Sequence, residues 1–271
     1  MTKKNFLYCI LIATILAGCS KDYDIKLPPN KSEIVVECYL EDGQPLRALI
    51  SESKGLLDTS RVPPLLQDAL VIITHNNVKD TLRPIPYVDT VRRRVYNYTN
   101  PKLVVANHNS NEPYRIDVYD RKGRYAYGET RFLPLVQIDS LNPIFNNQQE
   151  AYCLAKFTDP NPSMPNYFLL LINKNVEYDS LSLDVLFDNG FANNNNQFVF
   201  GSGYDFKRGD KIYGTLYHLL PEYHLYLTTL QNARSALGNP FAVSGEVVSN
   251  VKGGLGVFTA LSVTRKRVEV P

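Results

Sequence analysis

Polar and apolar residues alternate with a period of two along most of the chain, in short runs that turn residues separate. In the run from Tyr114 to Tyr119, for example, Tyr114, Ile116 and Val118 alternate with more polar neighbours. Successive side chains of a β-strand point to opposite faces, so this pattern predicts antiparallel sheets with one buried face. We expect strands at Ile34–Glu41, Leu46–Glu52, Ala69–Thr74, Lys79–Leu82, Val91–Asn97, Tyr114–Tyr119, Arg124–Thr130, Ala151–Phe157, Tyr167–Ile172, Phe198–Phe200, Lys211–Leu219 and Gly256–Val263.

The predicted strands fall into two groups, which indicates two domains. About seven short strands in roughly a hundred residues are typical of a β-sandwich of immunoglobulin-like or transthyretin-like type. Pro134 and Pro143 then interrupt the alternation between Phe132 and Gln149, as expected at a domain boundary. We therefore predict a mainly β protein, with an antiparallel β-sandwich at residues 31–135 and a second β-rich domain at residues 136–271.

One segment of the second domain has the period of an α-helix. Proline suits the first helical position and glycine suits the left-handed residue after a helix end, and Pro221 and Gly238 take these places. We expect an amphipathic helix at residues 221–237. After the last predicted strand we expect a charged tail from Thr264 to Arg267. The apolar positions of the helix are Tyr223, Tyr226, Leu227, Leu230, Ala233 and Leu237.

The beginning of the chain has the pattern of an export signal. Lys3 and Lys4 precede an apolar stretch of twelve residues that ends in Leu16-Ala17-Gly18-Cys19. Twelve helical residues span roughly 18 Å, less than the ~30 Å hydrocarbon core of a bilayer. The tetrad resembles the bacterial lipobox, in which the cysteine after the cleavage site carries diacylglycerol. We predict a lipoprotein signal peptide at residues 1–18 and a lipidated tether at residues 19–30, anchored at Cys19; an ordinary secretory signal is the alternative.

Charge and cysteine content agree with an exported protein. The chain has 29 Lys and Arg against 27 Asp and Glu, and removing Lys3 and Lys4 with the signal leaves the charges balanced. A neutral chain argues against a nucleic-acid partner, which needs basic side chains to displace counterions. After loss of Cys9 and acylation of Cys19, only Cys38 and Cys153 are left, both within apolar runs. We expect two buried thiols, with a Cys38–Cys153 disulfide as the alternative.

Motifs for catalysis or metal binding are missing from the sequence. It contains no HExxH metal motif, no GxSxG nucleophile elbow, no phosphate-binding loop and no GxGxxG. The histidines lack a partner at metal-ligand spacing, so we expect structural or surface roles for all four. We expect no catalytic residue, no metal ligand and no cofactor. The histidines are His75, His108, His218 and His224.

Four further patterns have a functional and a plainer interpretation. The polar segment Asp184–Asn196 and the region of Asp205 and Asp210 leave a calcium site open, but solvated loops are the favoured interpretation. Arg92-Arg93-Arg94 is expected to alternate its side chains across a strand and leave a modest charge patch. Gly253-Gly254-Leu255-Gly256 precedes a strand and is expected to pack tightly against a neighbouring backbone.

Four triplets resemble the short O-glycosylation site of exported Bacteroidota proteins. Glycosylation needs an acceptor hydroxyl in an exposed loop. We therefore treat four hydroxyls as candidate acceptors. They are Thr81, Thr90, Ser140 and Ser180, each preceded by aspartate.

Several segments match a known pattern in order along nearly the whole chain after the signal. They are the lipobox with its polar start Ser20–Asp24, Ile34–Glu37, Asp159–Phe168, Phe206–Asp210, the tyrosine-rich helix, Asn239-Pro240-Phe241 and Val248–Phe258. In this order they resemble a family of Bacteroidota outer-membrane lipoproteins, domain of unknown function 4249. Cys38 departs from the glycine that such proteins usually have there. The resemblance implies that the gene belongs to an operon that also encodes a TonB-dependent outer-membrane transporter. It also implies a family without established catalytic residues.

Together these expectations predict a non-enzymatic outer-membrane lipoprotein. It would be lipid-anchored through Cys19, with exposure at the cell surface and the leaflet that it faces both left open, and would serve as an accessory partner of a TonB-dependent transporter in nutrient uptake. A surface adhesion or scaffold module is the alternative. A hydrolase with an acid pair assembled from distant loops is the third interpretation, which a pocket joining two carboxylates would support.

Overall fold

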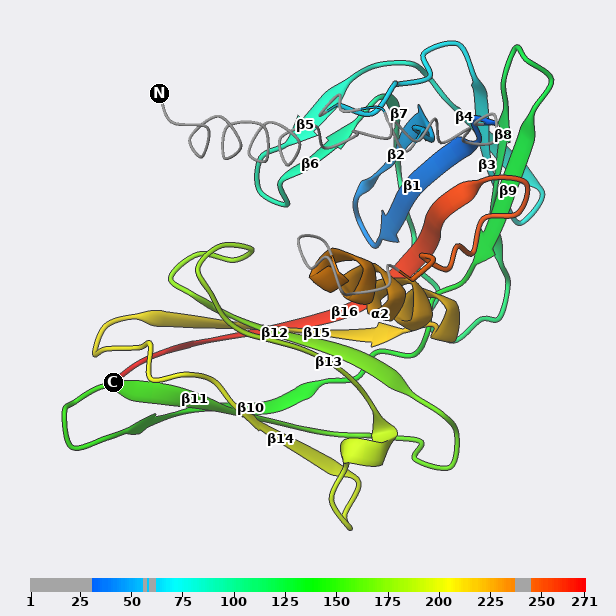
Figure 1. Cartoon of the computed structure of the whole chain (residues 1–271). Helices are drawn as coiled ribbons and strands as arrows, with labels where there is room; N and C mark the ends of the chain where they lie inside the picture. The colour runs from blue at the N-terminus through cyan, green and yellow to red at the C-terminus, as the bar shows by residue number, and fades with distance from the viewer. Residues whose placement is uncertain (1–30, 56–57, 59–61, 237–244) are drawn as a thin grey trace, which may run out of the picture. The chain divides into compact units, whose positions relative to one another are not determined.

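The computed structural model describes residues 31–55, 58, 62–236 and 245–271, which form four sheets, one α-helix and one 3-10 turn (Figure 1). The mainly β fold class is confirmed. The signal peptide, Cys19 and the tether to residue 30 lie outside the described residues. The strands are β1 (Ile34–Glu41), β2 (Pro45–Glu52), β3 (Leu70–His75), β4 (Val78–Leu82), β5 (Tyr87–Asp89), β6 (Arg94–Tyr96), β7 (Tyr98–Leu103), β8 (Tyr114–Tyr119), β9 (Tyr125–Thr130), β10 (Ile138–Phe145), β11 (Ala151–Thr158), β12 (Tyr167–Lys174), β13 (Leu181–Asp188), β14 (Gln197–Gly201), β15 (Lys211–Leu219) and β16 (Leu255–Glu269).

The largest sheet takes strands from both halves of the chain, in the order β13-β12-β15-β16-β1-β2-β7. Strand β16 connects the halves: residues 255–261 pair in parallel with β1, and residues 262–269 pair antiparallel with β15. Figure 1 draws β16 in red between these two neighbours. The main sheet is therefore continuous across the boundary expected at residue 135, and the independence of the two domains stays a prediction.

Alternation along β16 separates the hydrophobic cores. Phe258 and Ala260 pack in a core with residues of the four-stranded sheet β4-β3-β8-β9, and Val268 packs against a core formed with the three-stranded sheet β10-β11-β14. Val257 and Leu261, at odd positions, belong to a third core under the helix. Because neighbouring side chains of a strand point to opposite faces, the two smaller sheets cover one face of the main sheet and the helix covers the other.

The helix, α2 (Pro221–Ala236), begins at the predicted residue. It buries Tyr223 and Tyr226 against the main sheet. The predicted last residue, Leu237, and Gly238 lie outside the described residues. No helix in the described ranges is long and apolar enough to cross a bilayer.

Two expectations for the second half of the chain were wrong. The segment expected to break the alternation contains β10, which tolerates Pro143 because it is an edge strand of its sheet. The charged tail at residues 264–267 is part of β16. It stays in the sheet because Thr264 turns inward and its hydroxyl donates to the Val136 carbonyl at 2.6 Å, while Arg265 on the opposite face finds acidic partners.

A cluster of charges holds the start of β1 against the β8–β9 turn. Glu52, on β2, accepts hydrogen bonds from Lys122 Nζ at 2.6 Å, from Arg124 Nη2 and from Ser32 Oγ at 3.1 Å. The hydrogen bond from Lys122, followed by that from Arg124, lowers the pKa of Glu52 to about 2. A carboxyl group whose folded pKa is depressed stabilises the fold above its unfolded pKa, and this contribution is lost as pH falls through the folded value.

Replacing this carboxylate is expected to produce a defined pH signature. The Glu52→Gln variant should lose about 1 kcal/mol of unfolding free energy at pH 7, a value that allows for solvent screening of a cluster near the surface. The difference from the parent should narrow as pH falls from 4.5 towards 2. Urea titrations at a series of pH values would measure it, with Glu112→Gln at an exposed site as control. A difference that is constant with pH would contradict the ionic origin.

Candidate functional site

The histidines are dispersed and locally engaged. Each ring contacts a carbonyl oxygen or an aromatic ring, and burial lowers the pKa of His218 and of His224. Within the described ranges, no group of three or more His, Cys, Asp and Glu side chains could hold a metal ion. The contacts are His75 stacked on Tyr114 at 3.8 Å, His108 Nδ1 to Leu133 O at 2.8 Å, His218 Nδ1 to Pro134 O at 2.9 Å and His224 against Tyr167 at 4.5 Å.

Of the acids considered for calcium, Asp188, Asp205 and Asp210 have protein partners, whereas Asp184 lies on β13 and not in the expected loop. Asp188 caps the 3-10 turn η1 (Asn189–Phe191) by accepting the Gly190 N–H at 2.8 Å. The other contacts are Ser182 Oγ to Asp205, Lys174 Nζ to Asp210 at 2.9 Å and Asn175 Nδ2 to Asp210 at 2.9 Å. Through these bonds the acidic side chains fix the loops in which they lie.

The two cysteines are free, buried thiols in different cores. Burial raises the pKa of Cys38 well above its ordinary range and that of Cys153 to about 12. Thiolate, the reactive form, is therefore suppressed at both positions.

The candidate acceptor hydroxyls differ in exposure. Thr81 on β4, Thr90 in the β5–β6 turn and Ser180 before β13 are exposed, whereas Ser140 on β10 is half-buried. Glycosylation itself stays a prediction, as does acylation of Cys19.

The arginine run does not alternate across one strand, so that expectation was wrong. Arg92 and Arg93 lie in the turn between β5 and β6, and Arg93 has φ +53°, in the left-handed region. Only Arg94 lies on a strand. The turn aims Arg92 at Glu41 of the main sheet, and the Asp89 carboxylate fixes the turn by accepting the backbone N–H of Val91 at 3.1 Å and of Arg92 at 2.9 Å.

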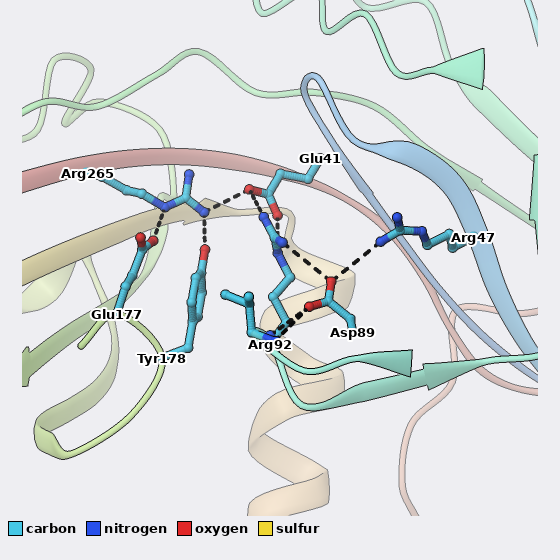
Figure 2. Close-up of polar contacts among 8 residues, drawn as sticks. Glu41, Arg47, Asp89, Arg92, Glu177, Tyr178 and Arg265 are labelled. Atoms are coloured by element: carbon cyan, nitrogen blue, oxygen red, sulfur yellow. Dashed lines mark hydrogen bonds and ion pairs between the residues drawn. The ribbon is translucent and has the colours of Figure 1, made fainter. Parts of the chain in front are cut away.

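Glu41, at the end of β1, is the centre of an ion-pair network that joins distant segments (Figure 2). Its two oxygens accept from Arg92 Nε and Nη2, both at 3.1 Å, and Oε1 also accepts from Arg265 Nη2 at 2.8 Å. Arg265 in turn donates to Glu177 and Tyr178 in the β12–β13 loop. The network therefore links β1 and β16 to two loops, one from each half of the chain.

Asp89 extends this network to β2. Its carboxylate lies 3.4 Å from Arg92 Nη1 and 3.5 Å from Arg47 Nη1, and the side chain is nearly buried. Arg47 also places its guanidinium carbon 3.7 Å from the centre of the Tyr87 ring. The side chains of Asp89 and Arg92 thus point from the β5–β6 hairpin towards the main sheet, whereas Arg93 is exposed and pairs with Asp179.

The outer face of the same hairpin is apolar, which inverts the usual pattern. Val88 and Val95 are cross-strand partners, 59% and 51% exposed, whereas Asp89 and Tyr96 are only 4% and 5% exposed. Val91 in the turn is exposed as well. Neighbouring exposed apolar side chains make this face a candidate interaction surface. We call Val88, Val91 and Val95 the valine face.

A cavity of about 140 Å³ lies beside the network, between the hairpin, the helix and the β12–β13 loop. Its polar lining comprises Glu41, Arg92, Arg94 and three tyrosines, and its apolar lining comprises leucines of β12 and β16. The lining residues are Glu41, Arg92, Arg94, Leu169, Leu171, Tyr178, Tyr217, Tyr223 and Leu261.

A larger, more open groove of about 460 Å³ lies between β9 and the start of the helix. It brings Glu129 and Glu222 into one lining, the arrangement that a hydrolase would need. Both side chains are exposed, and Glu129 Oε1 accepts from Arg115 at 2.8 Å. A general acid is normally kept protonated by a desolvated pocket, so the groove gives no positive support to hydrolysis.

Sequence reasoning missed both the network and the valine face. Asp89, Arg92 and Glu41 are separated by up to 51 residues, and no spacing rule brings them together. The alternation in Tyr87–Asp89 and Arg94–Tyr96 does indicate a hairpin with two different faces. It does not say which face is buried.

The chain was compared with known proteins. The family model described as "Domain of unknown function (DUF4249)" matches residues 20–267. A search of curated proteins found no match. Among solved structures, a DUF4785 family protein from Legionella pneumophila subsp. pneumophila str. Philadelphia 1 is similar at 13% identity and a TM-score of 0.25, over 68% of this chain. The similarity spans about half of that protein, 52%.

Proposed function

We propose the function below for a chain that belongs to the family described as Domain of unknown function (DUF4249). The chain is proposed to be a non-enzymatic outer-membrane lipoprotein, anchored through Cys19, that docks onto a TonB-dependent transporter and assists nutrient uptake. The observation that carries the docking part is the valine face, an apolar surface on a hairpin whose Asp89 and Arg92 side chains point inward.

The network supports this proposal because it fixes the hairpin. Two strands of three residues each would be marginal in isolation. The bonds from Arg92 to Glu41 and Asp89, with the ring contact of Arg47, tie the hairpin to the main sheet. A preformed surface loses little conformational entropy on binding, which favours affinity.

The lipid anchor would assist docking by holding the protein on the membrane of its partner. Acyl chains add about 0.8 kcal/mol for each buried methylene group, so a multiply acylated cysteine stays on the membrane. Confinement to the membrane plane raises the effective concentration of a membrane-embedded partner. A modest docking surface then suffices for stable association.

The partnership is tested by co-purification from the native host. A tagged chain extracted in mild detergent is expected to recover a TonB-dependent transporter, identified by mass spectrometry. The double variant Val88→Glu/Val95→Lys keeps an attractive cross-strand pair but removes the apolar surface, and its recovery of the transporter is expected to fall about tenfold or more.

The matched control is Val199→Glu, which places a charge on an exposed strand valine of β14. It should recover as much transporter as the parent. Failure of the parent chain to recover any transporter would contradict the proposed partnership. Equal recovery by the double variant would instead contradict docking through the valine face.

A further inference from the structure

We propose that the cavity between the hairpin and the helix binds a small organic monocarboxylate, with the guanidinium of Arg94 as the group that recognises the carboxylate. This inference goes beyond the docking function and does not depend on it, because the cavity lies on the inner side of the hairpin and the valine face lies on the outer side.

Arg94 differs from the other arginines of this region in lacking an acidic partner. Arg92 and Arg265 are both paired with Glu41. Among the described residues no carboxylate lies within ion-pair distance, 4.0 Å, of Arg94. Glu37 acts on it only through longer-range electrostatics. A half-buried guanidinium without a counterion is costly, and an anionic ligand would remove this cost.

The surroundings of Arg94 orient its donors and leave them available. Its guanidinium carbon lies 3.8 Å from the centre of the Tyr39 ring, so the plane is held by a cation–π contact. The side chains of Tyr96 and Tyr223 are its polar neighbours. A guanidinium has five N–H donors in a fixed fork, so donors are left for a ligand with the planar geometry of a carboxylate.

The remaining walls define the rest of the ligand. Leu169, Leu171 and Leu261 provide the apolar part of the lining. The volume of about 140 Å³ corresponds to about four or five water molecules in the liquid, which suits a short acid such as butyrate. The lining carries two guanidiniums and the Glu41 carboxylate, so its charge matches a singly charged ligand better than a phosphate or sulfate dianion.

The proposal is tested by titration calorimetry of the full chain in neutral detergent, with sodium butyrate as the probe. Butyrate is expected to bind, whereas 1-butanol, which lacks the charge, and sulfate, which lacks the apolar part, should bind at least about tenfold more weakly. The Arg94→Gln variant should weaken butyrate binding by about tenfold or more. Arg83→Gln, at an exposed position outside the cavity lining, is the matched control and should bind like the parent.

A second variant keeps the test decisive if Arg94→Gln does not fold. Leu171→Trp fills the cavity from the apolar side and retains the charges, and it should abolish butyrate binding. Because the chain has no tryptophan, the new side chain also reports folding by its fluorescence. Absence of butyrate binding by the parent, or unchanged binding by either folded variant, would overturn the proposal.

Discussion

Replacing Gly256 by alanine is expected to destabilise the protein by about 3 kcal/mol or more. Gly256 pairs with Val36 in the parallel ladder between β1 and β16. Its φ is +108°, a conformation that L side chains rarely adopt, and an added Cβ would lie 2.0 Å from the Val36 carbonyl oxygen. Relief of this overlap requires the two strands to separate. Since this pairing joins the two halves of the main sheet, urea unfolding should show a large loss of stability.

Gly43 provides the matched control for Gly256. It also has a positive φ, +70°, but an added Cβ there would meet no atom within 4 Å. Gly43→Ala therefore isolates backbone strain, which costs about 1 kcal/mol. If Gly256→Ala cost no more than Gly43→Ala, the close approach of β16 to β1 would be contradicted.

Replacing Cys19 by serine is expected to abolish acylation and to remove the protein almost completely from the outer-membrane fraction. Serine has no thiol, so it cannot form the thioether bond to diacylglycerol. The variant should incorporate no labelled palmitate, keep its signal peptide uncleaved after residue 18 and be missing from the outer-membrane fraction. Fractionation and intact-mass measurement would check these outcomes.

Cys9→Ser is the control for Cys19→Ser, because it alters a thiol in the same segment and leaves Leu16-Ala17-Gly18-Cys19 intact. It should be processed and retained like the parent. Normal cleavage and retention of Cys19→Ser would contradict lipid anchoring, and with it the confinement on which the proposed docking depends.

Local patterns predicted the strands well where both faces of a strand have distinct environments. Tyr114, Ile116 and Val118 are buried on β8 as the alternation requires. The same rule missed β10, since an edge strand accepts a proline. It also ended β16 too early, because Arg265 and Arg267 lie on a face where Glu41 and the Tyr213 ring meet them.

The prediction that Gly253-Gly254-Leu255-Gly256 packs tightly against a neighbouring backbone is confirmed. The sequence contains only part of the physical reason. An added Cβ would lie 2.4 Å from the Tyr125 carbonyl oxygen at Gly253 and 2.5 Å from that of Ile34 at Gly254. Only glycine permits such contacts. The clustering of glycines indicated a close backbone, but the strands on which they pack became known only from the fold.

The amino-acid order by itself determined the β-rich class, the position where the helix starts and the family, because each depends on local periodicity or on motifs in order. Tertiary structure alone decided which face of the β5–β6 hairpin is buried, which arginine beside the cavity has no acidic partner among the described residues, and how β16 joins the halves. These features depend on pairs such as Glu41 and Arg265, 224 residues apart. Coulomb attraction and burial act through space. The alternation of residues along a strand therefore does not predict which residues will pack against its two faces.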